Sequence, residues 1–154
     1  MKSHGPWSTS DFPELSWHDV HVHGVKLQNY DMDSGRADLV LDIDFITDWI
    51  QDGSECRFGV CPAELCFEGV SDYQMVLDYA GSTAGMCPFS IAEIQRETKQ
   101  YPNGYAEYQW HVKLNWPAGY LKFSAPGFTQ RLVGRPRVQK EQWLRSEHRG
   151  GNDA

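Results

Sequence analysis

Apolar and polar residues alternate with a period of two along most of this chain. In residues 108–116 an apolar side chain stands at every even position, and residues 39–45 and 73–79 carry one at every odd position. Successive side chains of a β-strand point to opposite faces, so each stretch is typical of a strand with one buried and one solvent-facing side. The pattern predicts a mainly β protein.

Turn-forming residues separate these stretches, as at residues 33–35 and 102–104. The predicted strands cover residues 18–27, 37–46, 56–60, 63–69, 73–79, 89–97, 105–116 and 119–125. Short turns join neighbouring strands in antiparallel pairs. One helical turn is predicted at residues 46–50, and a short C-terminal helix at residues 138–147, where good helix formers prevail. The expected architecture is an antiparallel sandwich or partly open barrel of about eight strands with a short C-terminal helix.

The length of 154 residues suits a single domain. We place this domain at residues 12–148, between a flexible N-terminus of residues 1–11 and a flexible C-terminus of residues 149–154, because both ends are polar and contain glycine. No apolar run approaches the roughly 18 residues of a membrane-spanning helix, and the first residues lack the apolar stretch of a signal peptide. The expected location is the cytoplasm, without membrane contact.

Charge is distributed unevenly along the chain. The whole sequence has 14 basic and 21 acidic residues, a net charge of −7, which makes it a poor candidate for binding nucleic acid or anionic lipid. Residues 1–130 hold 8 basic and 18 acidic residues, a balance of −10, whereas the remainder holds 6 basic and 3 acidic residues, a balance of +3. The simpler interpretation is that the basic segment packs across the acidic sheet of the same molecule. The alternative is that it contacts the acidic surface of a partner.

The cysteines show no metal-binding spacing. Cys56, Cys61, Cys66 and Cys87 include no Cys-x-x-Cys pair, which structural zinc sites commonly use. In a reducing compartment we expect four free, structural thiols. A disulfide or a metal-binding role is the alternative.

Histidine and aspartate alternate near the start of the first predicted strand. Val20 and Val22 should face the same side as Leu41 and Ile43, because a slip of one residue would bury charged groups. The opposite face then gathers three carboxylates and two imidazoles, from Asp19, His21, His23, Asp42 and Asp44. A change in the apolar phase after Gly24 predicts a β-bulge there.

Three interpretations of this face stay open: a solvated sheet surface with His–Asp pairs, a site for a divalent metal ion, or another kind of site. His111 also points outward on its own predicted strand and could join the cluster from a neighbouring strand. Because acidic surroundings favour a protonated imidazole, we expect raised pKa values for His21 and His23. A divalent metal is the cofactor that the second interpretation implies, and the first needs none.

Aromatic residues are abundant, with six tryptophans, seven tyrosines and seven phenylalanines. Such side chains can provide stacking platforms for a sugar or a base. Trp110 and Trp116 lie on the apolar face of their strand, so we expect them in the core. Trp7 and Trp17 are the candidates for an exposed aromatic surface.

Four segments resemble an uncharacterised family of small bacterial single-domain proteins. They are residues 15–19 (LSWHD), 41–46 (LDIDFI), 61–67 (CPAELCF) and 127–130 (GFTQ). The resemblance spans residues 12–144, implies a bacterial, cytoplasmic single domain, and supplies no catalytic residues. The chain is also broadly similar to the small β-rich immunity proteins that neutralise bacterial toxins.

The function that these observations favour is a non-catalytic binding or interaction module, with a protein partner or a second copy of the chain as its ligand. One alternative is a metal-dependent hydrolase that uses the His–Asp face. Another is a small-ligand or sugar-binding domain that uses aromatic side chains. Polar side chains that converge on a pocket would favour an enzyme, whereas a flat and partly apolar patch would favour an interaction protein.

Overall fold

The computed structural model describes residues 3–81 and 85–149. These residues form nine strands and two short 3-10 helices, with little other regular structure. The strands are β1 (Trp7–Ser8), β2 (His21–Asp31), β3 (Arg36–Asp52), β4 (Glu55–Asp78), β5 (Phe89–Gln100), β6 (Ala106–Trp116), β7 (Ala118–Ala125), β8 (Gly127–Leu132) and β9 (Arg137–Gln139). The helices are η1 (Thr9–Glu14) and η2 (Ser146–His148). The predicted mainly β class is confirmed.

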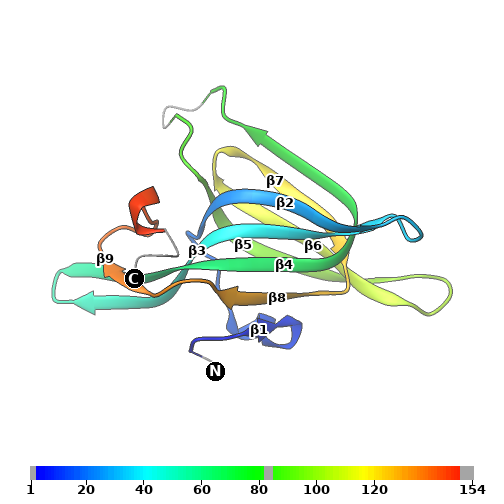
Figure 1. The fold of residues 1–154 in the computed structure, drawn as a ribbon, viewed down its shortest axis with the longest axis horizontal. Helices are drawn as coiled ribbons and strands as arrows, with labels where there is room; N and C mark the ends of the chain where they lie inside the picture. Colours follow the sequence, from blue (N-terminus) through cyan, green and yellow to red (C-terminus); the bar gives the residue numbers. More distant parts are fainter. Residues whose placement is uncertain (1–2, 82–84, 150–154) are drawn as a thin grey trace.

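All strands belong to one antiparallel sheet that partly closes on itself. The order is β1-β8-β4-β3-β2-β5-β6-β7, and a further pairing between β4 and β7 completes a ring. In Figure 1, β8, β4, β3 and β2 form a front layer, and β5, β6 and β7 lie behind them as a back layer. Of the two predicted architectures, the structure has the partly open barrel.

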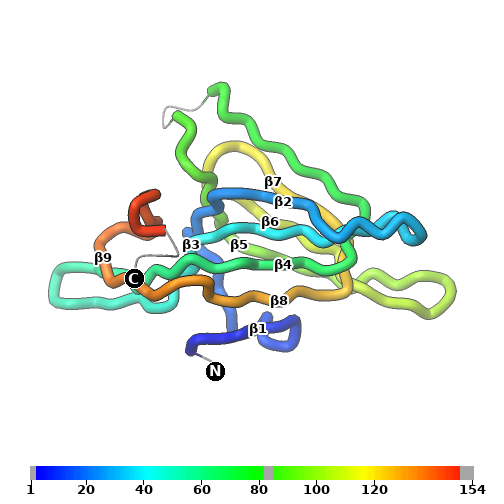
Figure 2. The backbone as a smooth tube through the Cα atoms, in the orientation of Figure 1, coloured from blue at the N-terminus to red at the C-terminus, as the bar shows by residue number. Residues whose placement is uncertain are grey.

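Strand β4 runs through both layers and bends where it leaves the first. Its early residues pair with β3, and residues from Ser71 to Asp78 pair with β7. The tube in Figure 2 shows this change of direction. Gly69 and Asp72 have φ angles of 63° and 52° at the corner, a left-handed conformation that glycine adopts without strain. The three strands predicted at residues 56–60, 63–69 and 73–79 are therefore parts of one bent strand.

Both predicted helices are wrong. Residues 46–50 continue β3, because their backbone groups pair with β4 as far as the Asp52–Glu55 partners. Residues 137–139 form β9, which pairs with residues 58–60 of β4, and only Ser146–His148 of the predicted C-terminal helix has a helical turn. No helix within the described residues is long and apolar enough to cross a membrane.

The space between the layers is filled with aromatic rings. The ring of Phe67 lies 4.6 Å from that of Phe123 and 5.0 Å from that of Trp110. Trp7 and Trp17, predicted as exposed aromatics, are each only 3% exposed, so that prediction is wrong. Trp7, on β1, packs against Phe45, and Trp17 packs against Phe128 and donates its Nε1–H to Gln130. The folded domain therefore begins at residue 7, before the predicted boundary at residue 12.

The four cysteines are free thiols, as predicted. Cys56 is exposed, Cys61 is buried, and Cys66 and Cys87 are half-buried. Burial, reinforced by Asp38, raises the pKa of Cys66 to about 11. This thiol is therefore protonated and unreactive at neutral pH.

Candidate functional site

The register of β2 and β3 brings the His–Asp face together. Val22 pairs with Ile43, and both are buried, so the predicted facing of the two strands is confirmed. The ladder resumes at Gly24 opposite Asp42, which leaves His23 without a partner in the ladder. The predicted β-bulge is present, and His23 is its extra residue.

Asp44 is the centre of a buried network on the outer side of the front layer. Its side chain is fully buried. Nε2 of His23 lies 2.6 Å from Oδ2, the backbone N–H of Leu144 donates to the same oxygen at 2.7 Å, and Nε of Arg149 donates to Oδ1 at 2.8 Å. Burial alone would raise the pKa of Asp44, but the hydrogen bonds from His23, Leu144 and Arg149 outweigh it and lower the pKa. Asp44 is therefore a charged, fully hydrogen-bonded carboxylate.

Arg149 joins the end of the described chain to two aspartates of β3. Its Nη1 and Nη2 donate to the two carboxylate oxygens of Asp42, at 3.0 and 2.6 Å, in a bidentate pair. Nη2 also donates to the carbonyl oxygen of Ile43 at 3.2 Å. The basic C-terminal segment packs across the acidic sheet of its own molecule, which confirms the simpler of the two predictions from charge. Ordered contacts thus extend past the predicted boundary at residue 148.

Asp19 and His21 lie beside this network and have partners of their own. The carboxylate of Asp19 accepts hydrogen bonds from Asn115 at 2.8 Å and from Gln142 at 2.9 Å. The imidazole of His21 packs against the ring of Trp143, at 6.2 Å between centroids. Burial lowers the pKa of His21 and outweighs the attraction of Asp44 and Asp19. The predicted rise in pKa is therefore wrong for His21.

The sixth predicted residue, His111, does not join the cluster. It lies on β6 in the back layer, opposite Lys122 and Gln95, with its ring 6.0 Å from that of Tyr120. Burial and the nearby charges of Lys122 and Lys113 lower its pKa. This candidate therefore lies away from the His–Asp face, because β6 belongs to the other layer.

The described residues include no group of three or more histidine, cysteine, aspartate or glutamate side chains that could hold a metal ion. Two features of the face account for this. Arg149 occupies carboxylate oxygens of Asp42 and Asp44, and the carboxylate of Asp19 contacts Asn115, Gln142 and the imidazole of His18. A guanidinium therefore takes the position that a cation would need between the aspartates.

A groove of about 470 Å³ lies next to the network. It is lined by Gly24, Val25, Lys26, Val40, Asp42, Pro62, Glu64, Val133 and Arg149. Two of its carboxylates are paired with arginines. Asp42 pairs with Arg149, which also lines the groove, and Glu64 pairs with the neighbouring Arg131 at 3.2 Å. The groove thus presents a floor of mixed apolar and compensated charged groups.

Trp49 and Phe58 of the β3–β4 hairpin form an aromatic cluster with His18, which we call the aromatic end. Trp49 and His18 are exposed, and Phe58 is half-buried. The rings of Trp49 and Phe58 meet edge to face at 4.9 Å, and the ring of His18 is stacked on Trp49 at 6.2 Å. Trp49 is 55% exposed. Sequence reasoning missed it because an irregularity between Ile46 and Asp48 changes the phase of β3 and turns Trp49 outward.

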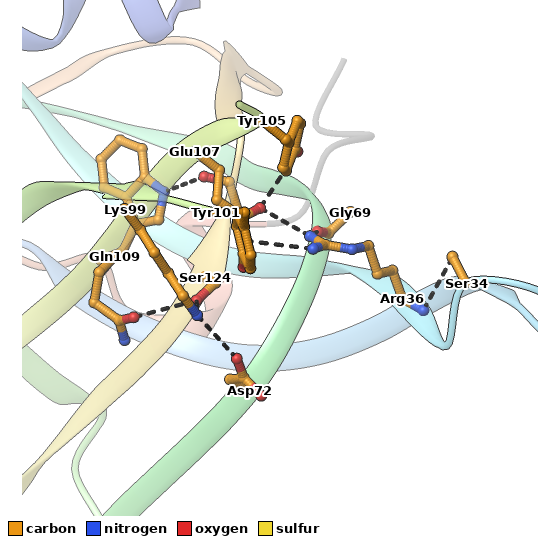
Figure 3. Close-up of polar contacts among 12 residues, drawn as sticks. Ser34, Arg36, Gly69, Asp72, Lys99, Tyr101, Tyr105, Glu107, Gln109 and Ser124 are labelled. Carbon is orange, nitrogen blue, oxygen red and sulfur yellow. Dashed lines mark hydrogen bonds and ion pairs between the residues drawn. The ribbon is translucent and has the colours of Figure 1, made fainter. Parts of the chain in front are cut away.

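A second buried acid, Glu107, is the centre of another group of polar contacts (Figure 3). Nη1 and Nη2 of Arg36 donate to its two oxygens at 2.9 and 3.3 Å, and the hydroxyls of Tyr101 and Tyr105 also donate to it. Nη1 of Arg36 donates as well to the carbonyl oxygen of Gly69, at 2.7 Å. Burial alone would raise the pKa of Glu107, but the hydrogen bonds from Arg36 and Tyr101 lower it. This cluster ties the corner of β4 to β3 and to the β5–β6 hairpin.

Comparison of the chain with protein-family models, with curated proteins and with solved structures gives no match. The outer face of the front layer is therefore interpreted from its own geometry. It carries a neutralised charge network and a groove, and the β3–β4 hairpin carries the exposed Trp49.

Proposed function

We propose that this protein is a non-catalytic interaction module, which binds a second copy of itself through the aromatic end. The observation that carries the proposal is the exposure of Trp49, which is 55% accessible although it lies on a folded sheet. Tryptophan is enriched among the residues that dominate protein–protein binding energy, and exposed apolar clusters mark contact surfaces. The edge-to-face contact with Phe58 holds the indole in place for such a contact.

The His–Asp network supports a structural role for the groups that an enzyme would use. Asp44 accepts hydrogen bonds on both oxygens, and Asp42 is held by the guanidinium of Arg149. A general base needs a carboxylate or imidazole that is free to take a proton from a substrate. In this network the carboxylates are already committed to internal donors.

A second copy is the partner that suits this surface, for two reasons. In a two-fold contact the same surface meets itself, and edge-to-face or offset packing makes an aromatic cluster complementary to a second such cluster. The hairpin of β3 and β4 also projects past the end of β2 in Figure 1, so its tip is accessible. A net charge of −7 opposes the approach of two copies, and the contact must therefore gain its free energy from apolar burial.

Sedimentation velocity over a range of protein concentrations tests the proposal. The wild-type chain is expected to form a dimer, and Trp49→Ala is expected to weaken it at least about 30-fold, the effect of losing roughly 2 kcal/mol at a binding hot spot. Tyr30→Ala is the matched control, because Tyr30 is 67% exposed on a different hairpin. Added salt should preserve or strengthen the dimer, since it screens the repulsion between acidic copies.

Two results would overturn the proposal. One is a monomer at every concentration tested, including the highest salt. The other is a dimer that Trp49→Ala and Tyr30→Ala affect equally, because the contact would then lie away from the aromatic end. Circular dichroism of each variant establishes that the fold is retained.

A further inference from the structure

The C-terminal segment forms a small recess with a basic lining. Its volume is about 250 Å³, and it is lined by Arg137, Gln139, Glu141, Trp143, Arg145 and His148. Two of these side chains are permanently cationic, and His148 becomes cationic when protonated. Glu141 contributes one negative charge, so the lining has a net positive charge in a protein whose net charge is −7.

The two arginines of the recess have no paired carboxylate, unlike several other arginines of this protein. Arg36, Arg131 and Arg149 each form an ion pair with a carboxylate. Within residues 3–81 and 85–149, the side chains of Arg137 and Arg145 have neither an ion pair nor a hydrogen bond, and Glu141 forms no ion pair with them. The two guanidinium groups outnumber the single carboxylate of Glu141 in the lining, and a bound anion neutralises the charge that is left.

The walls of the recess are held in position by the fold. Arg137 and Gln139 lie on the same side of β9, which is paired with Val60 and Phe58 of β4. The side-chain amide of Gln139 donates to the carbonyl oxygens of Glu141 at 3.0 Å and of Trp143 at 2.8 Å. The segment after β9 is thereby folded back around the recess. A site that is organised before binding loses less entropy when a ligand enters.

We propose that this recess binds a phosphoryl group. Guanidinium groups donate two parallel hydrogen bonds to phosphate oxygens, and a small basic recess matches a compact dianion better than it matches an extended polyanion. Trp143 also lines the recess, and its indole is the aromatic group on which a ring attached to the phosphoryl group would stack. Inorganic phosphate and a nucleoside monophosphate share this chemistry, and the experiment separates them.

Isothermal titration of the full chain at constant ionic strength tests the proposal, with inorganic phosphate and adenosine monophosphate as probes. Saturable binding is expected for the wild type, and the double variant Arg137→Ala/Arg145→Ala should bind at least tenfold more weakly. Lys140→Ala is the matched control, because this lysine belongs to the same segment but does not line the recess. If the nucleotide is the physiological source, it should bind more tightly than phosphate, and Trp143→Leu should remove that difference.

The proposal fails if neither probe binds saturably at millimolar concentration against a chloride reference. It fails equally if the double variant, or the single variant Arg145→Glu, binds both probes as the wild type does. Circular dichroism shows whether each variant keeps its strand content, and both arginines are exposed, so their replacement leaves the core intact. The result does not depend on self-association, which sedimentation measures separately.

Discussion

Asp44 and Glu107 are both fully buried carboxylates that pair with an arginine, yet their partners come from different kinds of structure. Arg36 at the start of β3, Gly69 at the corner of β4 and Tyr101 after β5 surround the Glu107 cluster. The partners of Asp44 are His23 in a β-bulge, and Leu144 and Arg149 in the C-terminal segment. One cluster joins parts of the sheet to one another, whereas the other joins the chain end to the sheet.

This difference predicts that the two clusters open in different ways. A buried charge is costly unless it is paired and hydrogen-bonded, so both clusters must stay satisfied in the folded state. Opening the Glu107 cluster requires the corner of β4 to separate from β3 and β6, which amounts to unfolding the barrel. The C-terminal segment can instead detach from Asp44 while the barrel stays folded. This would be a local opening, which costs less free energy than global unfolding.

The largest effect is expected for Glu107→Gln. The replacement leaves the guanidinium of Arg36 without its counter-charge, and breaking a buried ion pair costs about 3 kcal/mol or more of unfolding free energy. Urea denaturation measures this loss. Glu97→Gln, at an exposed position on β5, is the control and should change stability by less than about 0.5 kcal/mol. Equal effects of the two variants would contradict a structural role for the Glu107 cluster.

A smaller effect is expected for Arg149→Ala. Asp44 keeps its contacts with His23 and Leu144, so the loss of a charged hydrogen-bond donor should cost about 1–2 kcal/mol. The backbone N–H of Leu144 should also exchange with solvent faster, because its segment is held less firmly. Arg135→Ala, at an exposed position of the same segment, is the control. Unchanged exchange at Leu144 in Arg149→Ala would contradict the local-opening mode.

Acid titration compares the two clusters directly. Hydrogen bonds lower the pKa values of Asp44 and Glu107 below their ordinary values of 3.8 and 4.5. Their contribution to stability is therefore fully present above those values and is lost as the pH falls through the lower, folded-state values. Urea denaturation at several pH values between 5 and 2 should show this decline, and Asp44→Asn and Glu107→Gln should each make it shallower. A decline as steep as in the wild type would argue against both pKa shifts.

The smallest effect is expected at His21. Burial holds its folded-state pKa below 6.5, so the folded state favours the neutral imidazole. Its contribution to stability is present above pH 6.5 and is lost as the pH falls through the lower value. His21→Phe should make the melting temperature less dependent on pH between 7 and 5. The pH-dependent part of the unfolding free energy that this variant removes should be less than about 1 kcal/mol. If the melting temperature of the wild type rises as the pH falls over this range, the assigned direction is wrong.

Several predictions from sequence succeed because they depend on neighbours along or across one pair of strands. The alternation around Leu41 and Ile43 identifies the buried face of β3, and the phase change after Gly24 identifies the bulge at His23. The gathering of His23, Asp42 and Asp44 on one face follows from the same register. These features are encoded locally, since side-chain direction alternates with every residue.

The contacts that the sequence does not specify residue by residue join distant segments. Arg149 meets Asp44 across 105 positions of sequence, and Arg36 meets Glu107 across 71. The residues of β9 have helical propensity, but the free edge of β4 offers them backbone partners. Tertiary pairing overrides such weak local preferences, because every buried backbone group must find a hydrogen bond.

The sequence by itself determined the strand class, the direction of the buried faces and the set of acids on the outer side of the front layer. The tertiary structure decided what those acids do. It brought Arg149 onto Asp42 and Asp44, moved His111 to the other layer and left Trp49 exposed. The physical reason is that periodicity specifies which way a side chain points, whereas the cost of a buried charge is met by whichever donor the folded chain brings within reach.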